Sequence, residues 1–94
     1  MANETIDRER EKQLVAKVRV GAFFEHFKGK KYKILNIARH SETLGLCVVY
    51  QALYNSPEFG DHSIWVRPLE MFLETVEING KEVPRFRLIS ADVR

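Results

Sequence analysis

The segment HSET, residues 40–43, combines a histidine with a serine, a glutamate and a threonine, just before an apolar run that contains two tyrosines. Acyl transfer and general base catalysis use side chains of these types, with His40 as the base and Ser41 or Glu42 assisting. His40 and Ser41 are neighbours at the end of an expected strand, so their side chains diverge, and the sequence holds no G-x-S-x-G elbow. We therefore assign no catalytic residue and lean against an enzyme. A small hydrolase or transferase that uses His40 as its base stays an alternative.

The same segment also has the composition of a turn. The hydroxyl groups of Ser41 and Thr43 and the carboxylate of Glu42 can accept backbone N–H groups in a tight connection between strands. Loop residues that a rigid sheet positions are also common sites of ligand binding. The pattern favours a turn over a reaction and leaves a binding role open.

Metal and cofactor sites have little support. His26, His40 and His62 show no ligand-like spacing, so a histidine metal site requires the fold to gather three separate segments. Cys47, the only cysteine, stands among aliphatic residues and is expected in the core. The sequence contains no glycine-rich phosphate loop, so nucleotide hydrolysis is not indicated. We expect neither a metal nor a cofactor.

A second group of residues combines aromatic rings with arginines. Tyr50 and Tyr54 share a face of one expected strand, and Trp65 and Arg67 share a face of the next. Aromatic rings beside a guanidinium can hold an anion or stack a nucleic-acid base, which is worth about 1 to 3 kcal/mol per base. They can equally form a structural brace in which the arginine also pairs with a carboxylate. With the turn, they make up the expected ligand-binding residues: His40, Ser41, Glu42, Thr43, Tyr50, Tyr54, Trp65, Arg67 and Arg85.

Length and charge limit the class of protein. The chain has 94 residues, of which 45% are hydrophobic, enough for one small domain with a single core. It contains no run of about 18 apolar residues and no signal-peptide pattern, so we expect a cytoplasmic protein that does not enter the membrane. The net charge is +2, but residues 21–40 are mainly basic and residues 41–80 mainly acidic. Such a basic edge can meet phosphate, although most dedicated nucleic-acid binders are more basic overall.

Local patterns predict one helix followed by a mainly β region. Residues 4–18 read as a helix that Asn3 or Thr5 can cap, with acidic side chains leading and basic ones trailing. We divide the chain into an N-terminal helical extension, residues 1–18, and a single small β domain, residues 19–94. Recurrent turn signals among β-branched and aromatic residues indicate a small curled antiparallel sheet or an SH3-like barrel of about five or six strands. The expected strands are residues 22–27, 31–39, 44–54, 63–67, 74–78 and 81–86, with a loop at 55–62, a helical turn at 69–72 and a tight turn at Asn79-Gly80.

Alternation within the strands predicts which side chains share a face. Along residues 31–39 it places two groups on opposite faces, Tyr32, Ile34 and Ala38 on one and Leu35 and Ile37 on the other. Pro84 cannot donate a ladder hydrogen bond, so it puts the last expected strand at an edge of its sheet.

The chain closely resembles the small bacterial family called domain of unknown function 1653, in four segments that keep their order and spacing: GAFFEHFKGKKYKIL, ARHSETLGLCVVYQALY, IWVRPLEMFLETV and NGKEVPRF. The resemblance spans about residues 20–89 and leaves the helical segment outside. Phe24 and Phe27 stand where the family often has tyrosine, so hydrogen bonds from those hydroxyl groups are not available here. The resemblance implies a compact β domain with no established activity. It also implies that the polar and aromatic residues of the expected site are the ones to test.

Three classes of function follow from these observations. The leading hypothesis is a non-catalytic binding module for an anionic ligand such as a nucleotide or a nucleic-acid element. In it Arg67 and Arg85 pair with the anion, His40 and Glu42 orient the ligand, and the aromatic rings stack a planar part. An enzyme with His40 as its base is one alternative. The other is an interaction or assembly module that binds a protein partner or forms a homodimer through the edge near Pro84 or the N-terminal helix.

Overall fold

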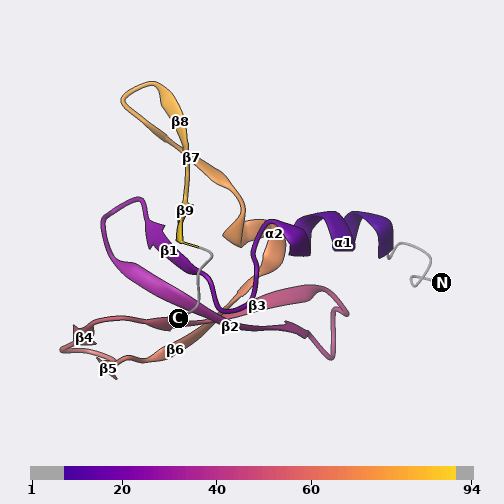
Figure 1. Ribbon diagram of the computed structural model, residues 1–94, viewed down its shortest axis with the longest axis horizontal. Helices are drawn as coiled ribbons and strands as arrows, with labels where there is room; N and C mark the ends of the chain where they lie inside the picture. The colour runs from indigo at the N-terminus through magenta and orange to yellow at the C-terminus, as the bar shows by residue number, and fades with distance from the viewer. Residues whose placement is uncertain (1–7, 91–94) are drawn as a thin grey trace.

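The computed structural model describes residues 8–90. Figure 1 shows a helix at one end of a curled sheet, with a separate hairpin projecting from it. The elements in chain order are α1 (Arg8–Ala16), β1 (Phe23–His26), β2 (Lys31–Arg39), β3 (Leu46–Ala52), β4 (Asn55–Ser56), β5 (Gly60–Asp61), β6 (Ile64–Pro68), α2 (Leu69–Phe72), β7 (Thr75–Ile78), β8 (Lys81–Pro84) and β9 (Phe86–Ser90).

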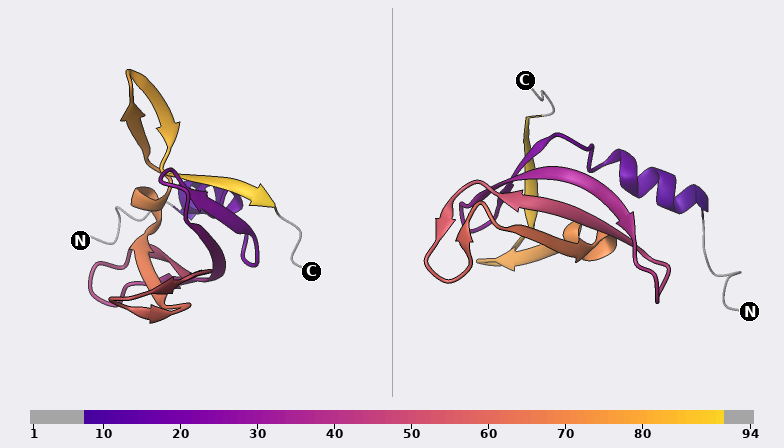
Figure 2. Two further views of the ribbon diagram at one scale, coloured as in Figure 1. Left: turned by 90° about the vertical axis from the view of Figure 1, so that its left-hand side faces the viewer. Right: turned by 90° about the horizontal axis from the view of Figure 1, so that it is seen from below.

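The main sheet has five antiparallel strands in the order β6-β3-β2-β1-β9, and β4–β5 and β7–β8 form two separate two-stranded sheets. In the right-hand view of Figure 2, β2 and β3 curve over β6 and α2. Strands β6 and β9 are the two edges and do not pair with each other within residues 8–90, so the sheet is not closed into a barrel. The predicted mainly β fold with an N-terminal helix is therefore confirmed, in the form of a curled antiparallel sheet.

A β-bulge in β2 corrects the predicted faces of that strand. Ile34 lies opposite Tyr50 and Asn36 lies opposite Val49, so the register shifts at Leu35. An extra residue in one strand moves every following side chain to the other face. Ile37 therefore joins Ile34 on the core side, and the prediction that these two residues face opposite ways was wrong.

The core lies on the concave side of the sheet, where α2 covers it. Leu69 and Phe72 of α2 are buried against residues from the inner faces of β1, β2, β3 and β9. The ring of Phe72 stacks on that of Phe86, with centroids 4.1 Å apart, and meets the edge of Phe24 at 5.4 Å. The helical turn predicted after Pro68 thus forms the lid of the core, because Leu69 and Phe72 are three residues apart on one face of the turn and are both buried.

The hairpin turns follow their local sequence signals. Asn79 and Gly80 have φ values of 51° and 81°, as a type I′ turn between β7 and β8 requires. The loop predicted at residues 55–62 was only partly correct, since it contains the short β4–β5 pair.

The last predicted strand, residues 81–86, is divided in the structure. Strand β8 ends at Pro84, and Phe86 begins β9, which pairs with β1 in the main sheet. The division has a physical cause, because Phe86 is only 6% exposed and enters the core, whereas its neighbours in β8 remain on the projecting hairpin. Pro84 does lie in an edge strand, since β7–β8 has only two strands.

Helix α1 packs against its own chain. Leu14 and Val15 contact the core, and Glu11 accepts a hydrogen bond from the guanidinium of Arg39 at 3.1 Å. Arg10 forms a second ion pair, at 3.4 Å, with Glu70 of α2. The predicted caps precede residue 8 and lie outside the described residues. No helix within residues 8–90 has the length and apolar composition needed to span a membrane.

The turn between β1 and β2 predicts the effect of one substitution. Gly29 has a φ of 102°, which an L-residue adopts only with strain. Gly29→Ala should lower the free energy of unfolding by about 1 to 2 kcal/mol, as measured by urea denaturation. The control is Gly45→Ala, because the added methyl group would meet Thr43 Oγ1 at an ordinary 3.5 Å and the φ there is not positive. If the two substitutions lower the free energy of unfolding equally, the positive φ of Gly29 is not the cause of the effect.

Candidate functional site

The HSET segment forms the turn between β2 and β3. Nδ1 of His40 accepts the backbone N–H groups of Glu42 and Thr43 at 3.1 and 3.2 Å. Thr43 Oγ1 in turn accepts the N–H of Gly45 at 3.2 Å. The side chains of His40 and Thr43 are therefore used to close the turn, and none of the ion pairs within residues 8–90 involves His40.

This turn lies apart from the aromatic residues with which it was grouped. Tyr50 pairs with Ile34 on β2, while His40 follows the end of β2 at Arg39. At about 3.3 Å per residue, the interval from Ile34 to His40 corresponds to about 15 to 20 Å. The predicted ligand-binding residues thus fall into two groups, the HSET turn at one end of the sheet and the aromatic residues with the arginines nearer its middle.

The aromatic residues form one continuous array on the concave face. The ring of Phe86 contacts those of Tyr50 and Tyr32, with centroids 5.6 and 5.7 Å apart, both edge-to-face. Tyr32 also meets the ring of Tyr54 at 5.6 Å, and their hydroxyl groups share a hydrogen bond of 2.6 Å. Tyr50 is 5% exposed and belongs to the core, whereas Tyr32 and Tyr54 are half-buried. The array therefore runs from the core to a partly open surface.

Arg67 lies over this array without an acidic partner. Its guanidinium carbon is 5.6 Å from the centre of the Phe86 ring, and its Nε donates to the hydroxyl of Tyr50 at 3.4 Å. Arg67 thus reaches from β6 across the concave face to the first residue of β9. No carboxylate of the described residues forms an ion pair with it. A half-buried guanidinium with aromatic contacts and no counter-ion can accept an anion.

Only one end of the Arg85 guanidinium takes part in a structural ion pair. Its terminal nitrogen forms an ion pair with Glu74 at 3.3 Å, which is the structural role expected of an arginine brace. Its Nε is buried without a hydrogen-bond partner among residues 8–90. A buried donor that is left unpaired costs about 1 to 3 kcal/mol, and a ligand would reach this Nε only if the Arg85 side chain moved.

His26 belongs to this surface, although no local pattern groups it with the arginines. Its ring meets Phe86 edge-to-face at 5.0 Å and Phe27 at 4.5 Å. Burial lowers the pKa of His26, and the positive charges of Arg67, Arg85 and Lys28 lower it further. Three cationic side chains from separate elements therefore act on one imidazole, which marks a region of positive potential.

The lowered pKa of His26 predicts a loss of stability in acid. Nδ1 of His26 accepts the backbone N–H of Lys28 at 3.2 Å, a bond that protonation of Nδ1 removes. The unfolded chain has the ordinary pKa of 6.5 and the folded chain a lower one, so the folded state binds this proton less readily. The contribution of His26 is therefore complete above pH 6.5 and is lost as the pH falls from 6.5 through the folded pKa.

Urea denaturation above and below pH 6.5 tests this linkage. Wild-type protein should lose more free energy of unfolding on acidification than His26→Gln, which cannot bind the proton. His62→Gln, a substitution of the same type at an exposed histidine, serves as the control. If acidification lowers the free energy of unfolding equally in His26→Gln and wild type, His26 is not the source of the pH dependence.

Lysines lie beside the open end of the array. The ammonium group of Lys30 lies 4.7 Å from the centre of the Tyr54 ring, and that of Lys28 lies 5.8 Å from the Phe27 ring. Burial, followed by the hydrogen bond to Tyr54, raises the pKa of Tyr32, so this phenol remains neutral at physiological pH. The array therefore combines hydroxyl groups with nearby positive charges.

Trp65 extends the aromatic surface towards the β4–β5 hairpin. It lies opposite Tyr50 in the β3–β6 ladder, and its indole N–H donates to Ser63 Oγ at 2.9 Å. Phe59, which is 58% exposed, meets the Trp65 ring edge-to-face at 4.9 Å. Trp65 and Phe59 thus present rings that a planar ligand could contact.

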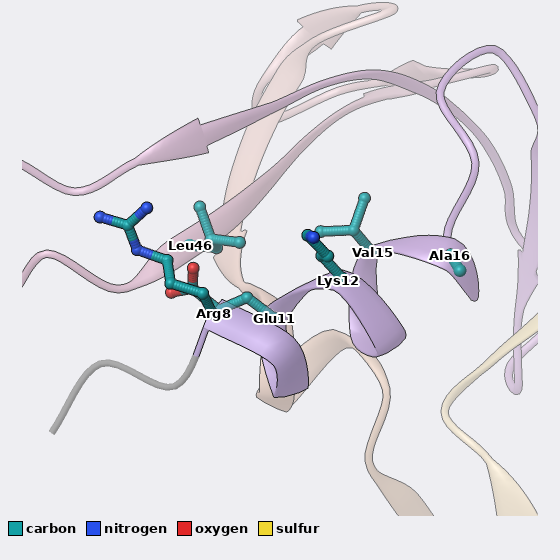
Figure 3. Close-up of a pocket in the computed structure, with 6 residues that line it drawn as sticks. All are labelled: Arg8, Glu11, Lys12, Val15, Ala16 and Leu46. Carbon is teal, nitrogen blue, oxygen red and sulfur yellow. The ribbon is translucent and has the colours of Figure 1, made fainter.

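A cleft of about 580 Å³ lies elsewhere, between α1 and the start of β3 (Figure 3). Its lining residues are Arg8, Glu11, Lys12, Val15, Ala16 and Leu46. None of the predicted site residues lines this cleft, and Glu11 is already paired with Arg39. The cleft is therefore a weaker candidate than the concave face.

The three histidines do not form a metal site. Within residues 8–90, no three histidine, cysteine, aspartate or glutamate side chains are gathered in a way that could hold a metal ion. His62 contacts its neighbour Asp61 at 2.6 Å, His40 closes the HSET turn, and His26 adjoins Phe86.

Comparison with known proteins places the described sheet in a family. The model of the family DUF1653, described as a protein of unknown function, matches residues 22–88. The crystal structure of a DUF1653 protein from Bordetella bronchiseptica is similar, with a TM-score of 0.65 and 32% sequence identity. The likeness covers 73% of this chain and 85% of that chain. No curated protein matches the sequence.

Proposed function

The chain belongs to the DUF1653 family, and we propose that it is a non-catalytic module that binds an anionic ligand, such as a nucleotide or a nucleic-acid element. The binding surface would be the concave face around Arg67, Arg85 and His26. The observation that carries the proposal is the guanidinium of Arg67, held over Phe86 and beside the Tyr50 hydroxyl with no acidic partner among the described residues.

Charge and hydrogen-bonding capacity support an anion as the ligand. Among residues 8–90 Arg67 has no acidic partner and Arg85 Nε has no hydrogen-bond partner, and both guanidinium groups lie close enough to lower the pKa of His26. A phosphate or carboxylate could accept hydrogen bonds from both guanidinium groups, and charge-assisted bonds of this kind are about twice as strong as neutral ones. Lys28 and Lys30 add positive charge at the rim.

The rings support a planar part of the ligand. Tyr54, which follows β3, hydrogen-bonds to Tyr32, and Trp65 of β6 lies opposite Tyr50, so both half-buried rings adjoin the array over which Arg67 lies. A base stacked on such a ring gains about 1 to 3 kcal/mol without sequence-specific contacts. A nucleotide, which joins an anion to an aromatic plane, satisfies both features at once. The HSET turn takes no part in the proposed site, because it lies beyond the end of β2, about 15 to 20 Å along the strand from Ile34, which pairs with Tyr50.

A thermal-shift screen tests the proposal, since a ligand selective for the folded state raises its melting temperature. The probes are pyrophosphate, mononucleotides and a short single-stranded oligonucleotide, each measured against wild type, Arg67→Ala and Arg87→Ala. Arg87 is the matched control because it is exposed and already paired with Glu25. We expect a shift with wild type and Arg87→Ala that Arg67→Ala loses.

Two results would overturn the proposal. The first is a shift of equal size in all three proteins, which would place the ligand elsewhere. The second is no shift with any phosphate-containing probe at low salt, where electrostatic binding is strongest. Circular dichroism of Arg67→Ala must show the wild-type fold for either comparison to count.

A further inference from the structure

Strand β6 is an edge of the main sheet (Figure 1), and its outward side chains are unusually exposed. Val66 is 63% exposed and Ile64 is 60% exposed, the two highest values among the large hydrophobic residues that the structure describes. Val66 lies opposite Val49 of β3, so the apolar surface extends from the edge strand to its neighbour. Apolar side chains on an open edge mark a site for strand pairing.

The backbone of β6 also has groups free to pair. The N–H of Ala52 donates to the carbonyl of Ser63 at 2.9 Å, which fixes the phase of the β3–β6 ladder. Because hydrogen-bonded and non-hydrogen-bonded pairs alternate in an antiparallel ladder, Trp65 and Arg67 bond to β3. Ile64 and Val66 therefore direct their N–H and C=O groups towards the open edge.

The usual protections of an edge strand are missing from β6. Its one charged residue, Arg67, turns its side chain to the concave face and lies over Phe86. The β3–β6 register runs without a bulge from Gln51–Ile64 to Cys47–Pro68. Pro68 protects only the end of the strand, so the segment from Ile64 to Arg67 stays open to another strand.

We propose that a second copy of this chain adds to β6, antiparallel and about a twofold axis at Val66. The sequence of the strand, IWVRP, is complementary to itself in this register. Val66 meets Val66 of the partner subunit, and Ile64 meets Pro68 of the partner subunit. Trp65 lies opposite Arg67 of the partner subunit, and the side chains of both stay on the concave face.

The hydrogen bonds also fit this register. The free amides of Ile64 and Val66 face carbonyl groups of the partner subunit, and the missing N–H of proline affects only the outermost pair. Trp65 and the opposing arginine form the non-hydrogen-bonded pairs, in which side chains come closest. The contact is short, so we expect a reversible dimer rather than a permanent one.

Sedimentation equilibrium of the full chain, up to millimolar concentration, tests the proposal. We expect a monomer–dimer equilibrium that Val66→Lys weakens by more than about tenfold, because the two lysines meet on the axis. Leu88→Lys is the matched control, since Leu88 is 43% exposed on the other edge strand, β9. Mixing Val66→Lys with Val66→Glu should restore dimers, as the introduced charges then attract each other.

Disulfide trapping tests the register. Val66→Cys should cross-link to its copy under mild oxidation, because directly opposed residues lie within the range that a disulfide spans. Ile64→Cys should not, since the twofold axis would separate its two copies by about 14 Å. Cys47 is buried and does not compete.

Each outcome either supports or contradicts the dimer. A monomer at every concentration would overturn the proposal, as would a dimer that Leu88→Lys disrupts and Val66→Lys leaves intact. Cross-linking of Ile64→Cys in preference to Val66→Cys would overturn the register about Val66.

Discussion

Replacing Phe72 with alanine will destabilise the protein by about 3 to 5 kcal/mol, the range typical of emptying a buried phenylalanine site. Phe72 is completely buried, and its ring contacts those of Phe86, Phe24 and Tyr50. Alanine would leave a cavity between α2 and the sheet, and neither side can collapse without moving the other. Small domains have total stabilities of about 5 to 15 kcal/mol, so much of the folded state would be lost.

Urea denaturation measures this effect, with Met71→Ala as the control. Met71 is the neighbour of Phe72 in α2, but it is 44% exposed. Its replacement should change the free energy of unfolding by less than about 1 kcal/mol. If Phe72→Ala has as small an effect as Met71→Ala, α2 is not the lid of the core.

Replacing Arg67 with alanine will reduce the affinity for a phosphate-containing ligand by about 10- to 100-fold. A hydrogen bond to a charged group contributes about 1.5 to 3 kcal/mol, and each 1.4 kcal/mol is a factor of ten in affinity. Arg67→Lys should recover only part of the loss, because lysine keeps the charge but loses the planar contact with Phe86. The probe is a fluorescently labelled single-stranded oligonucleotide, and the readout is its anisotropy at fixed salt.

The control for Arg67 is again Arg87→Ala, which removes the same charge from an exposed pair. Its affinity should stay close to that of wild type, apart from a small change in the dependence on salt. Equal losses in the two variants would mean that the oligonucleotide responds to net charge alone. That result would contradict a specific role for the concave face.

Local sequence signals predicted the elements whose geometry depends on adjacent residues. Asn79-Gly80 indicated the β7–β8 turn, and Pro68 indicated the start of α2, since each fixes the backbone where it stands. The bulge at Leu35 could not be predicted, because Ile34, Leu35 and Ile37 are all apolar and either phase of alternation is plausible. Phe86 was assigned to the wrong sheet, since its burial depends on β1, about 60 residues earlier in the chain.

The sequence predicted only part of the candidate site, again because long-range pairing cannot be read from local residues. Arg67 and Tyr50 were grouped correctly, because strands that follow each other closely in sequence often pair. His26 was missed, since only the long-range pairing of β1 with β9 brings it to Phe86. The HSET turn was grouped with the arginines on the strength of its polar residues, but His40 and Thr43 close the turn beyond the end of β2.

An NMR titration of the labelled protein with pyrophosphate and with the oligonucleotide tests the central claim most directly. We predict saturable shifts of the Arg67 Nε–H, the Trp65 indole N–H and the His26 ring, and a higher pKa for His26 when the anion is bound. The amides of residues 40–43 should not move. Saturable shifts confined to residues 40–43, or no saturable shift at all, would contradict the assignment of an anion-binding surface to the concave face.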